Sequence, residues 1–85
     1  MSSLPVLSGK ELIVILQKIG FRAIRQKGSH VFLKHADGRT TIVPIHPGEK
    51  IDRGLLNKII KKDLGISLEE FLIYKWKTKS YMITE

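Results

Sequence analysis

The chain has 85 residues, 42% of them hydrophobic, so it forms one small domain near the lower size limit for a single core. Fifteen basic against eight acidic residues give a formal net charge of +7, which favours a polyanionic partner or simply solubility. Disulfides and cysteine-based metal sites are excluded because there is no cysteine. The sequence has neither a membrane-length apolar run nor a signal-peptide pattern, so we expect a cytoplasmic protein without membrane contact.

The first predicted element is a helix that begins after Ser8. Ser8 and Glu11 have the three-residue spacing of a capping box, in which each residue satisfies a free backbone N–H of the other. Gly20 can adopt the left-handed conformation that commonly ends a helix. Between them, one helical face is apolar: Leu12, Ile15, Leu16 and Ile19.

Three short strands are predicted between residues 21 and 43. The segments "FRAIRQ", "HVFLKH" and "RTTIV" are rich in β-branched or aromatic residues, and the glycine-containing gaps "KGS" and "ADG" fit tight turns. This pattern predicts an antiparallel meander. Because side chains alternate along a strand, Val31 and Leu33 should face the helices, while the other face carries His30, Phe32 and Lys34.

A loop and a second helix follow the strands. Two prolines and a glycine restrict "PIHPGEK", residues 44–50, to a loop. Asp52 is the predicted N-cap of the helix, and Gly65 its end. The predicted buried stripe consists of Leu55, Leu56, Ile59 and Ile60.

A short final helix is predicted after Ser67, which again has a glutamate three residues later, at position 70. Phe71 and Trp76 on this helix are interpreted as core residues. The segment "KTKSYMITE", residues 77–85, has no clear period and is expected to form a loose tail.

Together these elements predict an α+β fold of order α-β-β-β-α, plus a short C-terminal helix. The helices must bury their apolar stripes on one face of a three-stranded antiparallel sheet, which leaves the other face available. By analogy alone, this architecture matches that of double-stranded-RNA-binding domains. We assign residues 1–73 to a single domain and residues 74–85 to a C-terminal tail.

Histidine is the best candidate for proton transfer in this chain. Serines are better explained as caps or turn residues, and paired carboxylates are missing. The three histidines, His30, His35 and His46, lack metal-ligand spacing on a helix, so we expect neither a metal site nor a cofactor. A histidine with an ordinary pKa near 6.5 can accept or donate a proton at neutral pH.

His30 has surroundings that suit RNA cleavage, because RNA carries its own nucleophile, the 2′-hydroxyl group. An enzyme then needs a proton acceptor, a proton donor and cations around the phosphate. Arg25, Lys27 and Lys34 flank His30 and could supply those cations. The alternative, a polar rim residue that happens to be histidine, stays open on these grounds.

The other polar candidates have two interpretations each. His46, held between prolines, is either the second acid or base or a residue that packs the loop. His35, next to "ADG", is interpreted as a solvated turn residue. A basic helix face is either a phosphate-contacting ridge or a solvated surface: Lys58, Lys61 and Lys62.

The motifs "SGKELIVILQKIGF", "RQKGSHVFLKH" and "TTIVPIHPGEKIDRGLLNKIIKKDLGISLEEFL" occur in this order over residues 7–72. In this arrangement the chain resembles the HicA-type toxins of prokaryotic toxin–antitoxin systems. The resemblance implies a double-stranded-RNA-binding-like fold and mRNA interferase activity that does not need the ribosome. It also implies an inhibitory HicB-type antitoxin as partner. The catalytic histidine of the family's "GSH" motif corresponds to His30.

We therefore expect a metal-independent endoribonuclease toxin, monomeric when free, with mRNA and a HicB-like antitoxin as partners. His30 is the expected catalytic residue and His46 a possible second acid or base. The expected RNA-binding residues are Arg25, Lys27, Gly28, Ser29 and Lys34. Two alternatives are a non-catalytic RNA-binding module, and a protein-interaction domain with a basic face for an acidic partner.

Overall fold

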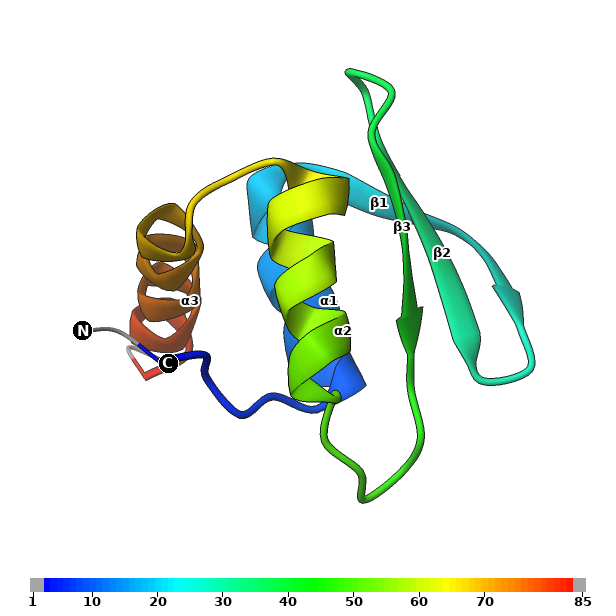
Figure 1. Ribbon diagram of the computed structural model, residues 1–85, viewed down its shortest axis with the longest axis horizontal. Helices are drawn as coiled ribbons and strands as arrows, with labels where there is room; N and C mark the ends of the chain where they lie inside the picture. The colour runs from blue at the N-terminus through cyan, green and yellow to red at the C-terminus, as the bar shows by residue number, and fades with distance from the viewer. Residues whose placement is uncertain (1–2, 84–85) are drawn as a thin grey trace.

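The computed structural model describes residues 3–83 and their side chains as far as Thr78 (Figure 1). The predicted order of elements is confirmed. The elements are α1 (Gly9–Ile19), β1 (Phe21–Lys27), β2 (His30–His35), β3 (Thr40–Pro44), α2 (Arg53–Lys58), the π-helical turn η1 (Ile59–Leu64) and α3 (Leu68–Ile83).

The molecule is built in layers, with the sheet at one side. Helix α1 and the turn η1 pack on one face of the sheet, and α2 leads into η1 on the same side. Helix α3 packs against α1 and η1 on the side away from the sheet (Figure 1). None of the described helices covers the opposite face, which we call the outer face. The prediction of helices on one face only is therefore confirmed.

Helix α1 begins and ends as the sequence predicts. The Ser8 hydroxyl accepts a hydrogen bond from the Glu11 N–H at 3.2 Å, and the Ser8 N–H donates to the Glu11 carboxylate at 2.8 Å. The helix ends at Gly20, whose φ of +122° is readily accessible only to glycine. Its buried positions include Leu12, Ile15 and Leu16.

The sheet is an antiparallel meander of order β1-β2-β3, as predicted. One irregularity was not predicted: the pairing of β1 with β2 shifts between Ala23 and Arg25. Ile24 is the extra residue of this β-bulge. A bulge resets the alternation of side chains, so Arg22 and Arg25 lie on the same face although three positions separate them.

The second helix begins at the predicted N-cap, where the Asp52 carboxylate accepts hydrogen bonds from the N–H groups of Gly54 and Leu55. It ends at Gly65, with a left-handed φ of +69°. Its second half, η1, is π-helical, which the apolar spacing did not indicate. Asp63 in η1 ties this element to the sheet, because its carboxylate accepts a 2.9 Å hydrogen bond from the Thr41 hydroxyl.

Helix α3 has 16 residues and is longer than the short helix we predicted. The Ser67 hydroxyl accepts from the Glu70 N–H at 3.0 Å and starts the helix as expected. Residues 77–83, expected as part of a loose tail, continue it. The last two residues of the expected tail, 84–85, lie outside the described residues.

The core lies between the sheet and the helices. Phe71 on α3 is fully buried, as predicted, but the assignment of Trp76 to the core is wrong, since it is 68% exposed. Five residues turn a helix by roughly 500°, which places Trp76 about 140° away from Phe71. The largest fully buried side chains are Phe21, Phe71, Leu12, Leu16, Leu33, Leu56, Ile59, Ile60, Leu64 and Val43.

Candidate functional site

The pairing of β2 with β3 brings two of the three histidines together. His30, the first residue of β2, pairs with Pro44, the last residue of β3. The chain reaches His46 two residues later. The imidazole rings of His30 and His46 lie 6.5 Å apart, centroid to centroid, with an angle of 81° between their planes. Sequence reasoning left the role of His46 open because it could not give this distance.

The loop that carries His46 is held at its start by backbone contacts. The Ile45 N–H donates a 2.7 Å hydrogen bond to the Ser29 carbonyl, which links the loop to the turn just before His30. Gly9 of α1 lies directly against the loop: a Cβ at this position would be 2.1 Å from the Pro44 carbonyl oxygen. Only glycine therefore lets α1 come this close to the start of the loop.

The end of the same loop is tied to the chain that precedes α1. The Ile51 N–H donates a 2.7 Å hydrogen bond to the Leu7 carbonyl, and Ser8 and Lys50 form an isolated antiparallel bridge. The Lys50 ammonium lies 3.9 Å from the Glu11 carboxylate. With both ends fixed, the loop presents His46 from a constrained backbone.

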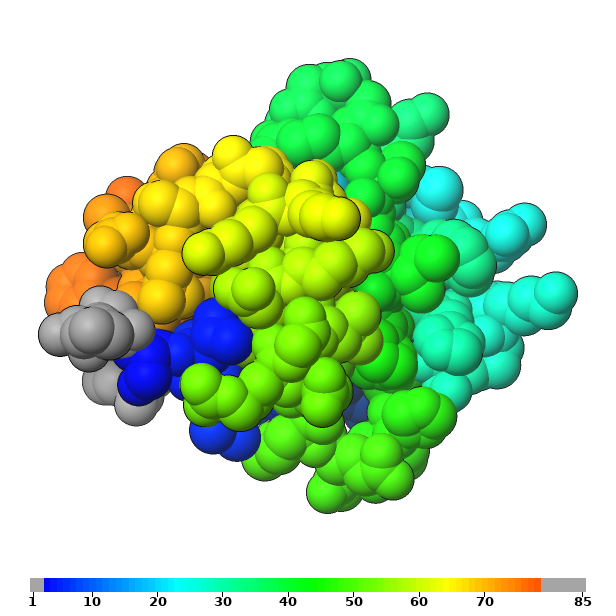
Figure 2. Space-filling view, in the orientation of Figure 1, coloured from blue at the N-terminus to red at the C-terminus, as the bar shows by residue number. Residues whose placement is uncertain are grey.

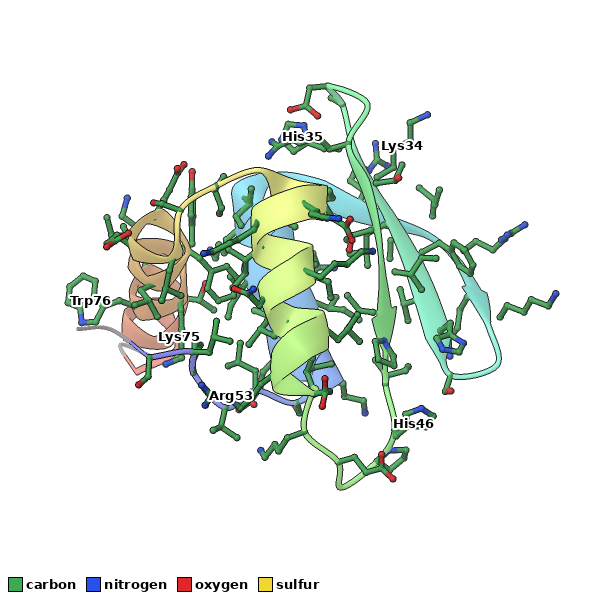
Figure 3. The ribbon with its side chains drawn as sticks, viewed as in Figure 1. Lys34, His35, His46, Arg53, Lys75 and Trp76 are labelled. Carbon is green, nitrogen blue, oxygen red and sulfur yellow. The ribbon has the colours of Figure 1, made fainter. Side chains whose placement is uncertain are left out.

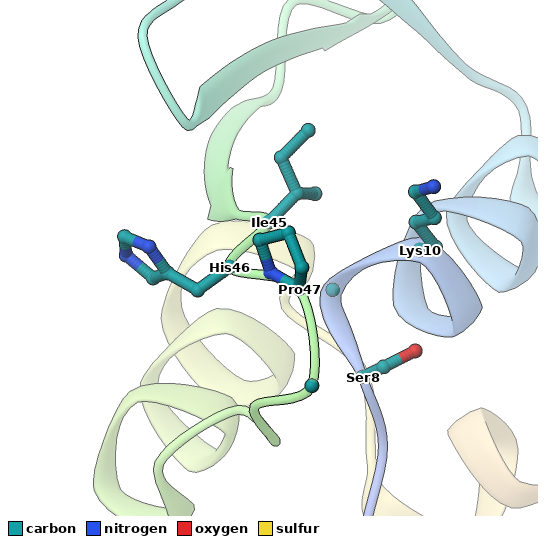
Figure 4. A pocket seen from close by; sticks show the side chains of 7 residues that line it. Ser8, Lys10, Ile45, His46 and Pro47 are labelled. Carbon is teal, nitrogen blue, oxygen red and sulfur yellow. The ribbon is translucent and has the colours of Figure 1, made fainter.

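A hollow of about 300 Å³ opens beside the contact between this loop and the start of α1 (Figure 4). It lies between residues 8–10 and residues 45–48. The His46 imidazole points away from Lys10 and from α1 (Figure 4). A second hollow of about 180 Å³ lies on the α2 side of the loop and is also lined by His46. The exposed imidazole thus stands between two depressions of the surface.

The outer face of the sheet carries its side chains in three transverse rows, because residues paired across neighbouring strands share a face. Side chains of β1 and β2 project on this side, away from the helices (Figure 2). From β1 through β2 to β3, the rows are Lys27–His30–Pro44, Arg25–Phe32–Ile42 and Arg22–Lys34–Thr40.

Each row contributes at least one basic side chain to the face that carries His30. The predicted cations Arg25, Lys27 and Lys34 all lie on the outer face and are exposed. Arg22 joins them there, and sequence reasoning missed it because plain alternation puts Arg22 and Arg25 on opposite faces. The segment around Ala23–Arg25 contains no local sequence signal of the bulge that the pairing of β1 with β2 shows.

Phe32 occupies the centre of this cationic surface. The guanidinium carbon of Arg25 lies 4.7 Å from the centroid of the Phe32 ring, within the range of a cation–π contact. On the other side, Phe32 pairs with Ile42, which is 44% exposed. The outer face thus combines apolar and basic groups.

The two residues of the β1–β2 turn have structural roles. Gly28 has a φ of +59°, and no atom lies within 4 Å of the position that a Cβ would take. Its left-handed backbone allows the tight turn, and its carbonyl accepts a 3.0 Å hydrogen bond from the side-chain amide of Gln26. Ser29 is half-buried, and its carbonyl binds the His46 loop as described.

His35 lies elsewhere. Its ring accepts a 3.1 Å hydrogen bond from the Asp37 N–H in the turn, as a turn residue should, but the expectation that it is solvated is wrong. Its ring is half-buried and packs 5.2 Å from Phe21, edge to face. It also fills the space next to Gly20, where a Cβ would be 2.7 Å from the His35 Nε2 atom. Strand alternation explains this, because His35 points to the helix side whereas its neighbour Lys34 points outward (Figure 3).

The lysines of the second helix do not share the outer face. Lys58 donates to the Asp63 carboxylate at 3.1 Å. Lys61 and Lys62 are exposed on η1, in the helical layer. Of the two interpretations, a solvated helix face fits this placement better than a ridge that continues the cationic rows.

Among the residues that the structure describes, no three histidine, aspartate or glutamate side chains gather where they could hold a metal ion. Within the same part of the chain, no helix has the length and apolar character required to span a bilayer.

The fold and the site define a class of protein: a small basic α+β domain whose open sheet face carries cations, with a pair of histidines at its edge. A family model described as "HicA toxin of bacterial toxin-antitoxin" matches residues 9–66, more than half of the chain. The chain therefore belongs to the HicA toxin family, and the predicted resemblance is confirmed. A toxin of such a system has an antitoxin as its partner. The search of curated proteins found no match.

Proposed function

We propose that this chain is an endoribonuclease toxin that cleaves mRNA and uses His30 as a general acid or base. The observation that carries the proposal is the pair of imidazoles, His30 and His46, at the edge of a cationic surface. The family assignment supports the toxin role.

The chemistry that suits this pair is transfer of the phosphate to the neighbouring 2′-oxygen. One imidazole accepts the proton of the 2′-hydroxyl while the 2′-oxygen forms a bond to phosphorus. The other imidazole donates a proton to the 5′-oxygen as the bond from phosphorus to that oxygen breaks. The products are a 2′,3′-cyclic phosphate and a 5′-hydroxyl. Both rings, 6.5 Å apart, can reach oxygens bonded to one phosphorus.

The cations contribute electrostatic stabilisation of the phosphate in the transition state. Lys27 pairs directly with His30 across the β1–β2 turn, so its ammonium group is the one best placed to contact the scissile phosphate. Arg25, Lys34 and the newly identified Arg22 lie further along the outer face and contact flanking phosphates. Ser29 positions both histidines. Its carbonyl accepts the hydrogen bond that anchors the loop of His46, and Ser29 directly precedes His30 in the chain.

The antitoxin partner is proposed to be a HicB-like protein that inhibits the toxin by covering His30 and the cationic rows. A surface with this much positive charge favours an acidic partner segment, because complementary charges steer association. The same cover would exclude RNA phosphates, so binding of antitoxin and of RNA would be mutually exclusive.

Product analysis tests the proposed reaction. Single-stranded RNA incubated with the protein in excess EDTA should yield fragments with 2′,3′-cyclic phosphate and 5′-hydroxyl ends. Fragments that appear only when a divalent metal is added, or that carry 5′-phosphates, would contradict histidine-driven transfer to the 2′-oxygen.

A non-catalytic RNA-binding module is the second candidate, because the basic outer face with Phe32 at its centre can hold RNA whether or not His30 acts. This alternative gives binding that weakens steeply with salt, since bound phosphates release counterions. It gives no new RNA ends after incubation. The product analysis above separates the two candidates.

A further inference from the structure

Phe32 is an aromatic side chain in an unusual place. It lies on the outer face, at the centre of the middle strand, where none of the described helices packs. Its neighbours in the row are Arg25 and Ile42, both of them exposed. The ring therefore does not belong to the buried core, which lies on the opposite side of the sheet.

The spacing relative to His30 is fixed by the strand. Residues two apart in a strand lie about 6.7 Å apart on the same face. Phe32 is thus one step from His30 along β2, and Lys34 is one step further. A chain of phosphates and planar bases laid along β2 would meet an imidazole, an aromatic ring and a cation in turn.

The chemistry of this row selects one kind of occupant. The guanidinium carbon of Arg25 lies 4.7 Å from the centroid of the Phe32 ring. This pair is suited to stack a nucleobase, either on the Arg25 guanidinium or on the Phe32 ring itself. Arg22, Lys27 and Lys34 around it match the phosphates of the same strand. Bases are free to stack only where RNA is single-stranded, since those in a duplex are already stacked on each other.

We propose that the outer face binds single-stranded RNA and that the Arg25–Phe32 pair stacks the base next to the scissile phosphate, which makes Phe32 a specificity-determining residue. This inference rests on the proposed function for the position of the scissile phosphate. It departs from the double-stranded-RNA-binding analogy, in which recognition depends on duplex shape. Ile42 forms the apolar edge of the platform.

Fluorescence of a base analogue tests the inference without cleavage. The probe is a single-stranded RNA with 2′-O-methyl groups throughout, which blocks the nucleophile, and one 2-aminopurine placed at successive positions. We expect strong quenching at one position on binding of the wild-type protein. Phe32→Tyr, which keeps the ring, should retain the quenching. Phe32→Leu should lose it and should bind about 5- to 100-fold more weakly.

Two controls separate the base platform from general effects. Ile24→Ala changes an exposed apolar residue of the bulge, outside the row, and should leave quenching and affinity unchanged. A fully complementary duplex of the probe should bind more weakly than the single strand. Equal affinity for the duplex, or quenching that Phe32→Leu retains, would overturn the inference.

A second measurement uses the wild-type protein only and does not depend on the folding of a variant. Removing the base from one nucleotide at a time should weaken binding at a single position by about 5- to 100-fold. Uniform small losses along the probe would overturn the inference, because they would indicate contacts to the RNA backbone without a base platform. If the probe is bound with this pattern but unmodified RNA is never cleaved, the proposed nuclease function fails while the base platform stands.

Discussion

His30 and His46 are 16 positions apart in sequence, yet their rings lie 6.5 Å apart because β2 begins beside the end of β3. Neither residue needs a specialised cleft. Strand β2 fixes the position of His30, and the anchored loop after β3 fixes the position of His46. In the reaction proposed above, this relationship lets one imidazole accept a proton while the other donates one.

Replacing His46 tests whether the pair acts together. His46→Ala should lower cleavage by about 100-fold and remove one limb of a bell-shaped dependence of kcat/KM on pH. The fold should persist, because the side chain is exposed. Cleavage should be measured with the wild type and the variant over the same pH range. If both limbs survive in His46→Ala, another group shares the proton transfer with His30.

Gly9 allows the close contact between α1 and the loop that presents His46. Gly9→Ala places a methyl group 2.1 Å from the Pro44 carbonyl oxygen, so the helix or the loop must move. We expect a loss of about 1–3 kcal/mol in the free energy of unfolding, together with reduced cleavage. Denaturant titration and an initial-rate assay on the same samples would measure both.

Gly54→Ala is the matched control for Gly9→Ala. Gly54 also lies near the start of a helix, but the nearest atom to an added Cβ is a side-chain oxygen of Asp52, at 3.1 Å, and not a backbone atom at 2.1 Å. The free energy of unfolding should change by less than about 1 kcal/mol, in either direction. Equal effects of the two substitutions would contradict a special role for the contact at Gly9.

Phe71 and Trp76 on α3 should differ sharply in their contributions to stability. Phe71→Ala removes a fully buried ring and should cost about 3–5 kcal/mol in the free energy of unfolding. Trp76→Ala removes a ring that is 68% exposed and should change this value by no more than about 0.5 kcal/mol. Thermal unfolding of the two variants would settle the comparison, and similar shifts in Tm would contradict the placement of Trp76.

The capping box of α1 should make stability depend on pH. The Ser8 backbone N–H, which donates to the Glu11 carboxylate, lowers the pKa of Glu11 below its ordinary value of 4.5. A lowered folded-state pKa gives stability that is present above the ordinary pKa and lost as pH falls through the folded-state value. The contribution should be below about 1 kcal/mol, since the side chain is exposed.

Glu11→Gln isolates this contribution, because a glutamine oxygen can still accept the Ser8 hydrogen bond but does not titrate. The difference in unfolding free energy between wild type and Glu11→Gln should shrink as pH falls below about 4. Asp37, whose pKa is lowered mainly by a hydrogen bond from the Arg39 N–H, is common to both proteins and cancels in the difference. A difference that stays constant with pH would contradict the role of the Glu11 carboxylate.

Local signals in the sequence were sufficient for much of the fold. Caps at Ser8 and Asp52, stops at Gly20 and Gly65, and the alternation in β2 depend on neighbouring residues only, and each is confirmed. Alternation also placed His30 on the open face. The same rule, applied to His35, would have placed it on the helix side, but its position beside the turn was given more weight.

Features that depend on how distant segments of the chain pair with each other could not be predicted from local signals. The bulge at Ile24 changes the pairing of β1 with β2, and it alone brings Arg22 and Arg25 to one face. The distance between His30 and His46 follows from the register of β3. Helix α3 has no apolar periodicity in its second half, so its length escaped a search for amphipathic patterns.

The central claim is that His30 transfers a proton during RNA cleavage. The most direct test compares cleavage of single-stranded RNA in EDTA by the wild type, by His30→Ala and by Lys61→Ala, which removes an exposed charge far from the outer face. Circular dichroism should show the same fold for all three. We expect Lys61→Ala to cleave at the wild-type rate and His30→Ala to be slower by at least about 100-fold. A folded His30→Ala protein that cleaves RNA at the wild-type rate would contradict the account.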